Sequence, residues 1–169
     1  PVQAQAIPAV LQGRDLLALA PTGSGKTLAY ALPLLQRLQV ARRPWPHRTQ
    51  ALVLLPTREL AQQVGEVIAA LARSLPEPPK VVTAHGGVSI NPQLMALRGG
   101  AELVVATPGR LFDLLDHRGL RLQALNCVVL DEADRLLEAG FADEWARIRA
   151  ALPGGPERRL QHLLLSATL

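Results

Sequence analysis

A short glycine-rich stretch near the amino terminus has the residue types and spacing needed to hold a phosphate group. The stretch from Gly23 to Thr27 reads Gly-Ser-Gly-Lys-Thr, follows an apolar run at residues 16–20, and precedes residues with helical spacing. Glycines let backbone N–H groups turn inward, and the first turn of a helix offers further N–H groups to an anion. The pattern predicts a strand, a phosphate-binding loop and a helix, with Lys26 near the outer phosphates and the Thr27 hydroxyl on Mg²⁺.

One residue departs from the general phosphate-loop pattern, which has glycine at the position of Ala20. The alternative interpretation is an ordinary Gly-Ser turn followed by an unrelated lysine. The location of the loop directly after a buried-type strand favours the phosphate site.

Two adjacent carboxylates form the second candidate group. Asp131 and Glu132 directly follow the apolar run at residues 127–130, which has the composition of a buried strand. At such a strand end one carboxylate can help to hold Mg²⁺ while the next orients or deprotonates an attacking water. Alone, this acidic pair is more typical of a solvated turn; together with the upstream Gly-Lys-Thr loop it favours a hydrolytic site.

Alternating strands and helices are expected to position these groups. Apolar runs predict strands at residues 15–20, 51–55, 81–84, 103–106, 127–130 and 162–165. Helical spacing predicts helices beginning near Pro8, after the phosphate loop with a bend at Pro33, and at about residues 60–71, 92–97, 111–115 and 142–152, with loops at 41–50 and 153–156. This alternation predicts an α/β fold in which helices cover a mainly parallel sheet, with the polar motifs at the carboxyl ends of the strands.

Composition restricts the protein class. The 169 residues fit one domain; 49% are apolar and 3% aromatic, which predicts a core of Leu, Val and Ala. The net charge of +4 permits a polyanionic partner without requiring one. Cys127 is the single cysteine and lies in an apolar run, so we expect a buried, inert thiol and a reducing, cytoplasmic location. No apolar stretch approaches the roughly 18 residues of a membrane span, so no membrane partner is predicted.

Seven short motifs, taken in order, resemble those of DEAD-box RNA helicases. The resemblance covers essentially the whole chain, and the family's own phosphate loop has alanine at the position of Ala20. Residues 87–100 are most similar to the bacterial RhlE-type branch. The seven motifs are Pro1-Val2-Gln3, residues 20–27, residues 56–61, Gly86-Gly87, residues 107–110, residues 131–134 and residues 166–168.

The resemblance implies that residues 1–169 are a RecA-like P-loop NTPase domain, a three-layer α/β/α sandwich that binds ATP and Mg²⁺. The family works with a second RecA-like domain of the same protein, which is absent from this chain. Glu132 would be the catalytic base, supported by Lys26 and Asp131, and Thr27 and Asp131 would hold the metal. The implied ATP-binding residues are Gln3, which would read the adenine edge, and Ala20, Thr22, Gly23, Ser24, Gly25, Lys26 and Thr27.

The resemblance also implies a sequence-independent contact with the sugar-phosphate backbone of RNA, to which Arg, hydroxyl and backbone N–H groups are suited. The matching residues are Pro56, Thr57, Arg58, Gly86, Gly87, Thr107, Gly109 and Arg110. From the residues alone, Thr57 can equally cap a helix and Gly86-Gly87 can be a plain turn, and both interpretations can hold together with RNA binding.

Asp134, Ser166 and Thr168 resemble the residues that couple ATP turnover to strand separation, through hydrogen bonds between residues 166–168 and the 131–134 segment. The expected function is therefore the ATP-binding half of an ATP-dependent RNA helicase. One alternative is an ATP-gated RNA clamp that does not unwind a duplex, and another is a different P-loop ATPase that acts on DNA or protein.

Overall fold

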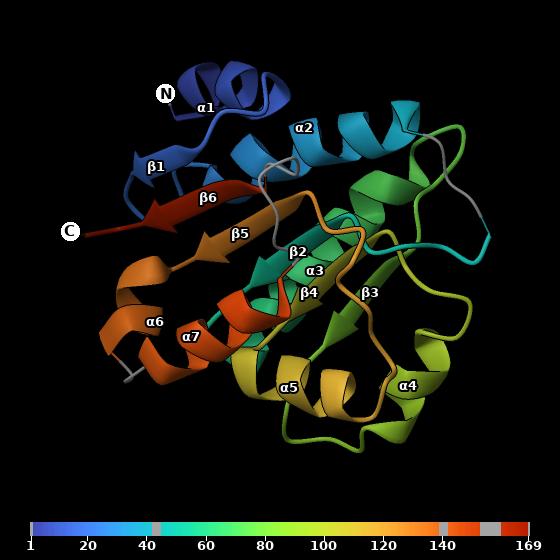
Figure 1. The fold of residues 1–169 in the computed structure, drawn as a ribbon. Helices are drawn as coiled ribbons and strands as arrows, with labels where there is room; N and C mark the ends of the chain where they lie inside the picture. Colours follow the sequence, from blue (N-terminus) through green and yellow to red (C-terminus); the bar gives the residue numbers. More distant parts are fainter. Residues whose placement is uncertain (1, 42–44, 139–141, 153–159, 169) are drawn as a thin grey trace.

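The computed structural model describes residues 2–41, 45–138, 142–152 and 160–168 (Figure 1). The strands are β1 (Leu16–Leu19), β2 (Ala51–Leu54), β3 (Val81–Ala84), β4 (Leu103–Ala106), β5 (Cys127–Asp131) and β6 (Gln161–Ser166). The helices are α1 (Val2–Leu11), α2 (Lys26–Val40), α3 (Arg58–Arg73), α4 (Asn91–Ala96), α5 (Pro108–Asp116), α6 (Ala133–Glu138) and α7 (Ala142–Ala151).

Within the described residues, six strands form one sheet in the order β1-β6-β5-β2-β4-β3, and every neighbouring pair is parallel. Parallel neighbours need long crossovers, which the helices between the strands supply. The carboxyl ends of all these strands therefore lie along one edge of the sheet. The predicted α/β fold with a parallel sheet is confirmed.

Helices cover both faces of the sheet, as Figure 1 shows with α1, α2 and α3 on one side and α4, α5 and α7 on the other. Successive strand residues point to opposite faces. On β2, Ala51 and Val53 accordingly join the core beneath α2 and α3, whereas Leu52 and Leu54 join the core on the α5 side. Burial on both faces explains why the strands have continuous apolar runs.

The amino-terminal helix differs from the prediction, which began it near Pro8 after an extended entry. Helix α1 begins at Val2 and contains Pro8. Proline lacks the N–H that would bond to the carbonyl four residues earlier, which locally disfavours a helix interior. Burial of Ala6, Ala9 and Val10 outweighs this cost, because α1 packs along α2. Helix α2 also contains its proline, Pro33, and is a single helix from Lys26 to Val40.

Helix α6 is not among the predicted helices, because it has only six residues and directly follows the acidic pair at the end of β5. The loop predicted at residues 153–156 lies outside the described residues. Among the helices that the structure describes, none combines the length and apolar character that crossing a membrane would require.

The expected buried thiol is confirmed. Cys127 is fully buried in β5, and burial raises the pKa of its thiol to about 12. Because the thiolate is the reactive form of cysteine, this thiol is chemically inert near neutral pH.

Candidate functional site

The predicted phosphate loop lies between β1 and α2. Gly23 and Gly25 have φ angles of 80° and 88°, in the left-handed region that glycine adopts without the cost a side chain brings. Gly25 caps α2, and its carbonyl accepts the N–H of Ala29 at 3.1 Å. These two glycines are required by the backbone path, and the loop delivers the chain into the helix with the first N–H groups of α2 facing the loop.

Lys26 reaches across this loop. Lys26 is 6% exposed, and its ammonium donates to the Ala20 carbonyl at 2.6 Å. A buried charge needs such a partner, because desolvation is otherwise costly. The contact uses the backbone of residue 20, and its φ angle is not positive, so alanine serves there as well as glycine. This explains structurally how the chain accommodates its departure from the general loop pattern.

Tyr30 joins the loop to the acidic strand end. Its hydroxyl is fully buried, donates to Asp131 Oδ2 at 2.9 Å, and is also hydrogen-bonded by the Thr27 side chain. Burial and the neighbouring Asp131 charge raise the pKa of Tyr30 well above its ordinary value. Burial also raises the pKa of Asp131, which the Tyr30 hydrogen bond partly counteracts. Thr27 and Asp131, the two predicted metal ligands, thus meet at one phenol oxygen.

The oxygen donors of this group suit Mg²⁺, which proteins commonly hold through one or two side chains plus phosphates and water. Within the described part of the chain, no group of three or more His, Cys, Asp or Glu side chains gathers as a metal cage. A carboxylate and a hydroxyl beside a phosphate loop are compatible with a metal that arrives with its nucleotide.

Sequence reasoning missed Tyr30. Its spacing from Lys26 places it one helical turn further along α2, on the same side of the helix. A buried tyrosine hydroxyl needs a hydrogen-bond partner, and this general rule was the available signal.

Glu132 has a strained backbone. Its φ is 53°, and its N–H donates to Asp131 Oδ1 at 3.0 Å. Non-glycine residues with positive φ are uncommon and cluster at functional sites. The left-handed conformation of Glu132 produces a sharp turn of the chain between β5 and α6. The side chain of Glu132 is half-buried.

Asp134 connects α6 to the end of β6. Its Oδ2 accepts the Thr168 hydroxyl at 2.8 Å and the Thr168 N–H at 3.1 Å. The Ser166 hydroxyl donates to the Thr168 carbonyl. Hydrogen bonds, of which the one from the Thr168 side chain has the largest effect, hold the pKa of Asp134 far below its usual range. The structure contains the expected hydrogen bonds between the two segments, and their coupling role stays a prediction.

Gln3, on α1, approaches the phosphate loop. Its Nε2 donates to the Gly25 carbonyl at 3.4 Å, and a Cβ at Gly25 would lie 2.3 Å from the same nitrogen. The absence of a side chain at Gly25 therefore allows Gln3 to reach the loop. Recognition of adenine by Gln3 stays a prediction.

The residues predicted to contact RNA lie after β2, β3 and β4, which are neighbours in the sheet. Thr57 caps α3 by accepting the Leu60 N–H at 3.3 Å, which confirms the capping interpretation. The Arg58 side chain is 61% exposed and pairs with Glu59 at 2.5 Å. It also lies against Gly87, where φ is 79° and a Cβ would be 2.7 Å from an Arg58 nitrogen. Two of the predicted RNA motifs are therefore in contact.

Thr107 precedes Pro108 and Gly109 at the start of α5, and its N–H donates to the Ala84 carbonyl at 3.2 Å. Arg110 differs from an ordinary surface cation, because it is 7% exposed and hydrogen-bonded to Gln93, Val88 and Asp113. Sequence reasoning did not include Gln93, and no local pattern points to it.

The sheet order separates the two predicted groups. The carboxyl ends of β1, β6 and β5 carry the phosphate loop, residues 166–168 and residues 131–134, whereas those of β2, β4 and β3 carry the residues predicted to contact RNA. The boundary between the groups falls between β5 and β2, which are hydrogen-bonded neighbours.

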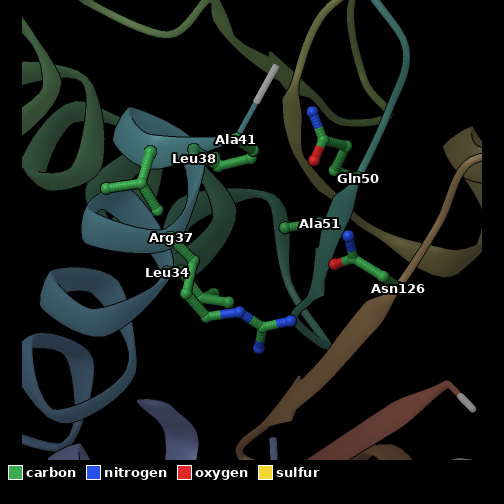
Figure 2. A pocket seen from close by; sticks show the side chains of 8 residues that line it. Leu34, Arg37, Leu38, Ala41, Gln50, Ala51 and Asn126 are labelled. Atoms are coloured by element: carbon green, nitrogen blue, oxygen red, sulfur yellow. The ribbon is translucent and has the colours of Figure 1, made fainter. Parts of the chain in front are cut away.

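A cavity of about 240 Å³ lies at the amino ends of β2 and β5, away from the carboxyl ends that carry the predicted site. Figure 2 shows Arg37 of α2 extending toward Asn126, with Gln50 and Ala51 nearby at the start of β2. Arg37 is already hydrogen-bonded to Gln161. Because the cavity lies beside the amino ends of β2 and β5, it is separate from the predicted site at the carboxyl ends of the strands.

Comparisons with known proteins agree with the resemblance. The family model described as DEAD/DEAH box helicase matches residues 1–169. The chain is 44% identical to the DEAD-box ATP-dependent RNA helicase CshA of Streptococcus pneumoniae, covering 100% of this chain and 30% of that protein. It is 46% identical to the ATP-dependent RNA helicase DeaD of Escherichia coli, covering 100% of this chain and 25% of that protein.

Solved structures agree as well. The yeast DEAD-box splicing factor Prp28 aligns over 100% of this chain and 40% of its own, with a TM-score of 0.91 and 34% identity. The chain thus spans about a quarter to a third of the curated relatives it matches. Similarity to the RhlE-type branch in particular stays a prediction.

Proposed function

Because the chain belongs to the DEAD/DEAH box helicase family, we propose that it is the ATP-binding half of an ATP-dependent RNA helicase, acting in the cytoplasm. The observation that carries this proposal is the convergence of Lys26, Thr27 and Asp131 around the loop and the Tyr30 hydroxyl. A glycine loop, an ammonium and oxygen ligands for a divalent cation are what phosphoryl transfer requires, since catalysis there is mainly positioning and charge stabilisation.

In this proposal Lys26 exchanges the Ala20 carbonyl for oxygens of the outer phosphates. The N–H groups of residues 22–27 surround the phosphates, and Gln3 contacts adenine at the other end of the nucleotide. Thr27 and Asp131 would hold Mg²⁺, which supplies positive charge to the phosphates when bound. Glu132 accepts the proton of the water that attacks the outer phosphate. RNA binds along the carboxyl ends of β2, β4 and β3, through its sugar-phosphate backbone.

We further propose that the protein has a second RecA-like domain that completes both sites. The relatives it matches are three to four times longer, which supports this. Opening a duplex needs surfaces that grip RNA differently as ATP is turned over, and a single rigid sheet edge offers only one of them. The isolated 169 residues are therefore expected to bind ATP and RNA weakly and to hydrolyse ATP poorly.

The test compares the full protein with the isolated chain in RNA-stimulated ATP hydrolysis and in displacement of a labelled strand from an RNA duplex. We expect both activities in the full protein only. Robust unwinding by the isolated chain would overturn the two-domain proposal. ATP-dependent RNA binding by the full protein without release of a strand would instead identify an RNA clamp, and stimulation by DNA but not RNA would identify another class of ATPase.

A further inference from the structure

The turn after β3 is held from both ends by side chains of other elements. This turn, residues 85–88, contains the predicted RNA contacts Gly86 and Gly87. The His85 carbonyl accepts Gln93 Nε2 at 3.1 Å, and the Val88 carbonyl accepts Arg110 Nη2 at 2.8 Å. The two glycines therefore lie between two fixed carbonyls.

The two side chains that hold the turn are bonded to each other. Arg110 Nη1 donates to Gln93 Oε1 at 2.9 Å, and the residues are 7% and 8% exposed. The remaining Arg110 nitrogen, Nε, donates to Asp113 Oδ2 at 3.2 Å. Buried polar groups are costly unless their hydrogen bonds are made, and here both side chains are engaged. Gln93 of α4 and Arg110 of α5 thus form one closed network with the turn.

This network joins two backbone segments that face open space. A Cβ at Gly86 or at Gly109 would meet no atom within 4 Å, so an extended chain can approach the backbone at both places. Gly109 belongs to the first turn of α5, whose N–H groups suit a phosphate. The network fixes the spacing between this helix start and the Gly86-Gly87 turn.

We propose that the Gln93–Arg110 pair is a positioning unit for RNA binding, and this inference rests on the proposed function. The pair holds the glycine turn and the start of α5 in register, so that both meet phosphates of one strand without reorganising. Binding to a preformed site avoids the entropic cost of ordering it. Arg110 then acts through the turn, and Gln93, which belongs to none of the seven motifs, is a positioning residue.

The primary test is Gln93→Met in the full protein, which keeps the side-chain length and removes both hydrogen bonds. We expect the KM for RNA in RNA-stimulated ATP hydrolysis to rise by roughly five- to tenfold, because two hydrogen bonds that order the turn are lost. The KM for ATP and the kcat at saturating RNA should stay at wild-type values. Gln36→Met, at an exposed glutamine of α2, is the matched control and should change neither KM.

A second variant separates positioning from direct contact. If Arg110 acts only by holding the turn together with Gln93, then Arg110→Met should raise the RNA KM by a similar factor, and the double variant should be no worse than either single variant. The salt dependence of RNA binding should keep its slope. A direct phosphate contact would instead give additive effects and a slope reduced by about one in Arg110→Met.

An unchanged RNA KM in Gln93→Met, or additive effects with Arg110→Met, would overturn the inference. An equal rise in the KM for ATP would also overturn it, since that would place the effect of Gln93 on both sites instead of on RNA binding alone. Thermal unfolding checks each variant, and Gln93→Glu, which keeps an acceptor for Arg110, should show a smaller loss if Gln93→Met proves unstable. Absence of RNA stimulation in the wild-type protein would refute the proposed function itself, which is a distinct outcome.

Discussion

Along the carboxyl edge of the sheet, the ends of β1, β6 and β5 differ from those of β2, β4 and β3 in where they place charge. In the first region Lys26 and Asp131 are buried and held by the Ala20 carbonyl and the Tyr30 hydroxyl. In the second region the cation on the surface is Arg58, while Arg110 is buried beneath a glycine turn.

The difference corresponds to two kinds of binding. Phosphoryl transfer depends on charges held in a fixed, desolvated geometry. Contact with a polynucleotide backbone depends on open N–H groups and a firm support below them. Substitutions in the first region should therefore affect ATP chemistry, and substitutions in the second should affect RNA affinity.

The largest expected effect is that of Glu132→Gln in the full protein. Removal of the proposed base should lower the kcat for ATP hydrolysis by about 100- to 10,000-fold, the usual contribution of a general base. ATP affinity should remain, because the amide keeps the shape of the side chain. Single-turnover hydrolysis and equilibrium binding measure the two quantities. Hydrolysis at the wild-type rate would remove Glu132 from the chemistry.

Next in size is Lys26→Ala, which should weaken ATP binding by about 100-fold, because charge-assisted hydrogen bonds to phosphates are lost. Titration calorimetry measures the affinity. Lys80→Ala is the matched control, since Lys80 is the chain's other lysine and lies just before β3, where it donates to the Arg98 carbonyl. Equal ATP affinity in Lys26→Ala and wild type would break the division between the two regions.

In the second region, Gly87→Ala should lower the free energy of unfolding by about 1–2 kcal/mol, because a side chain is strained in the left-handed conformation. The new Cβ would also displace Arg58. RNA affinity should fall several-fold while ATP affinity is retained. Gly86→Ala is the control for stability, since a Cβ there meets no atom within 4 Å. A loss of ATP affinity in Gly87→Ala would mean that the regions are not separable.

The smallest effect concerns Asp134, which bonds Thr168. Its pKa is lower in the folded chain than the ordinary value of about 3.9, so its contribution to stability is present above that pH and is lost as the pH falls further. Asp134→Asn should therefore flatten the acid limb of a stability curve measured by urea unfolding below about pH 4. Asp116→Asn controls for the loss of one negative charge. An unaltered acid limb in Asp134→Asn would contradict the prediction.

Much of the fold could be predicted because buried parallel strands have continuous apolar runs. The start of α1 could not be predicted, because local rules disfavour Pro8 in a helix interior. They contain no information on the burial of Ala6 and Val10, which depends on the packing of α1 against α2. Tertiary packing therefore decides whether the gain from burying Ala6 and Val10 exceeds the cost of Pro8 within the helix.

The candidate site shows the same division. Glycines 23, 25 and 87 could be predicted, since their chemistry is local to the backbone. Tyr30 and Gln93 could not, because a side chain's hydrogen-bond partner is set by elements distant in the sequence: Tyr30 and Asp131 are 101 residues apart. Arginine is usually a surface residue, so the sequence does not predict the burial of Arg110. Its burial depends on its contacts with Gln93 of α4 and with the turn after β3.

The inert thiol of Cys127 has a practical consequence for following these regions by spectroscopy. Cys127 is the only cysteine of this chain and is fully buried. A cysteine introduced at an exposed position, such as Met95 on α4, would be the one accessible thiol here, and a maleimide dye would attach there alone. Thiol titration of the unaltered, folded chain should accordingly find no reactive group.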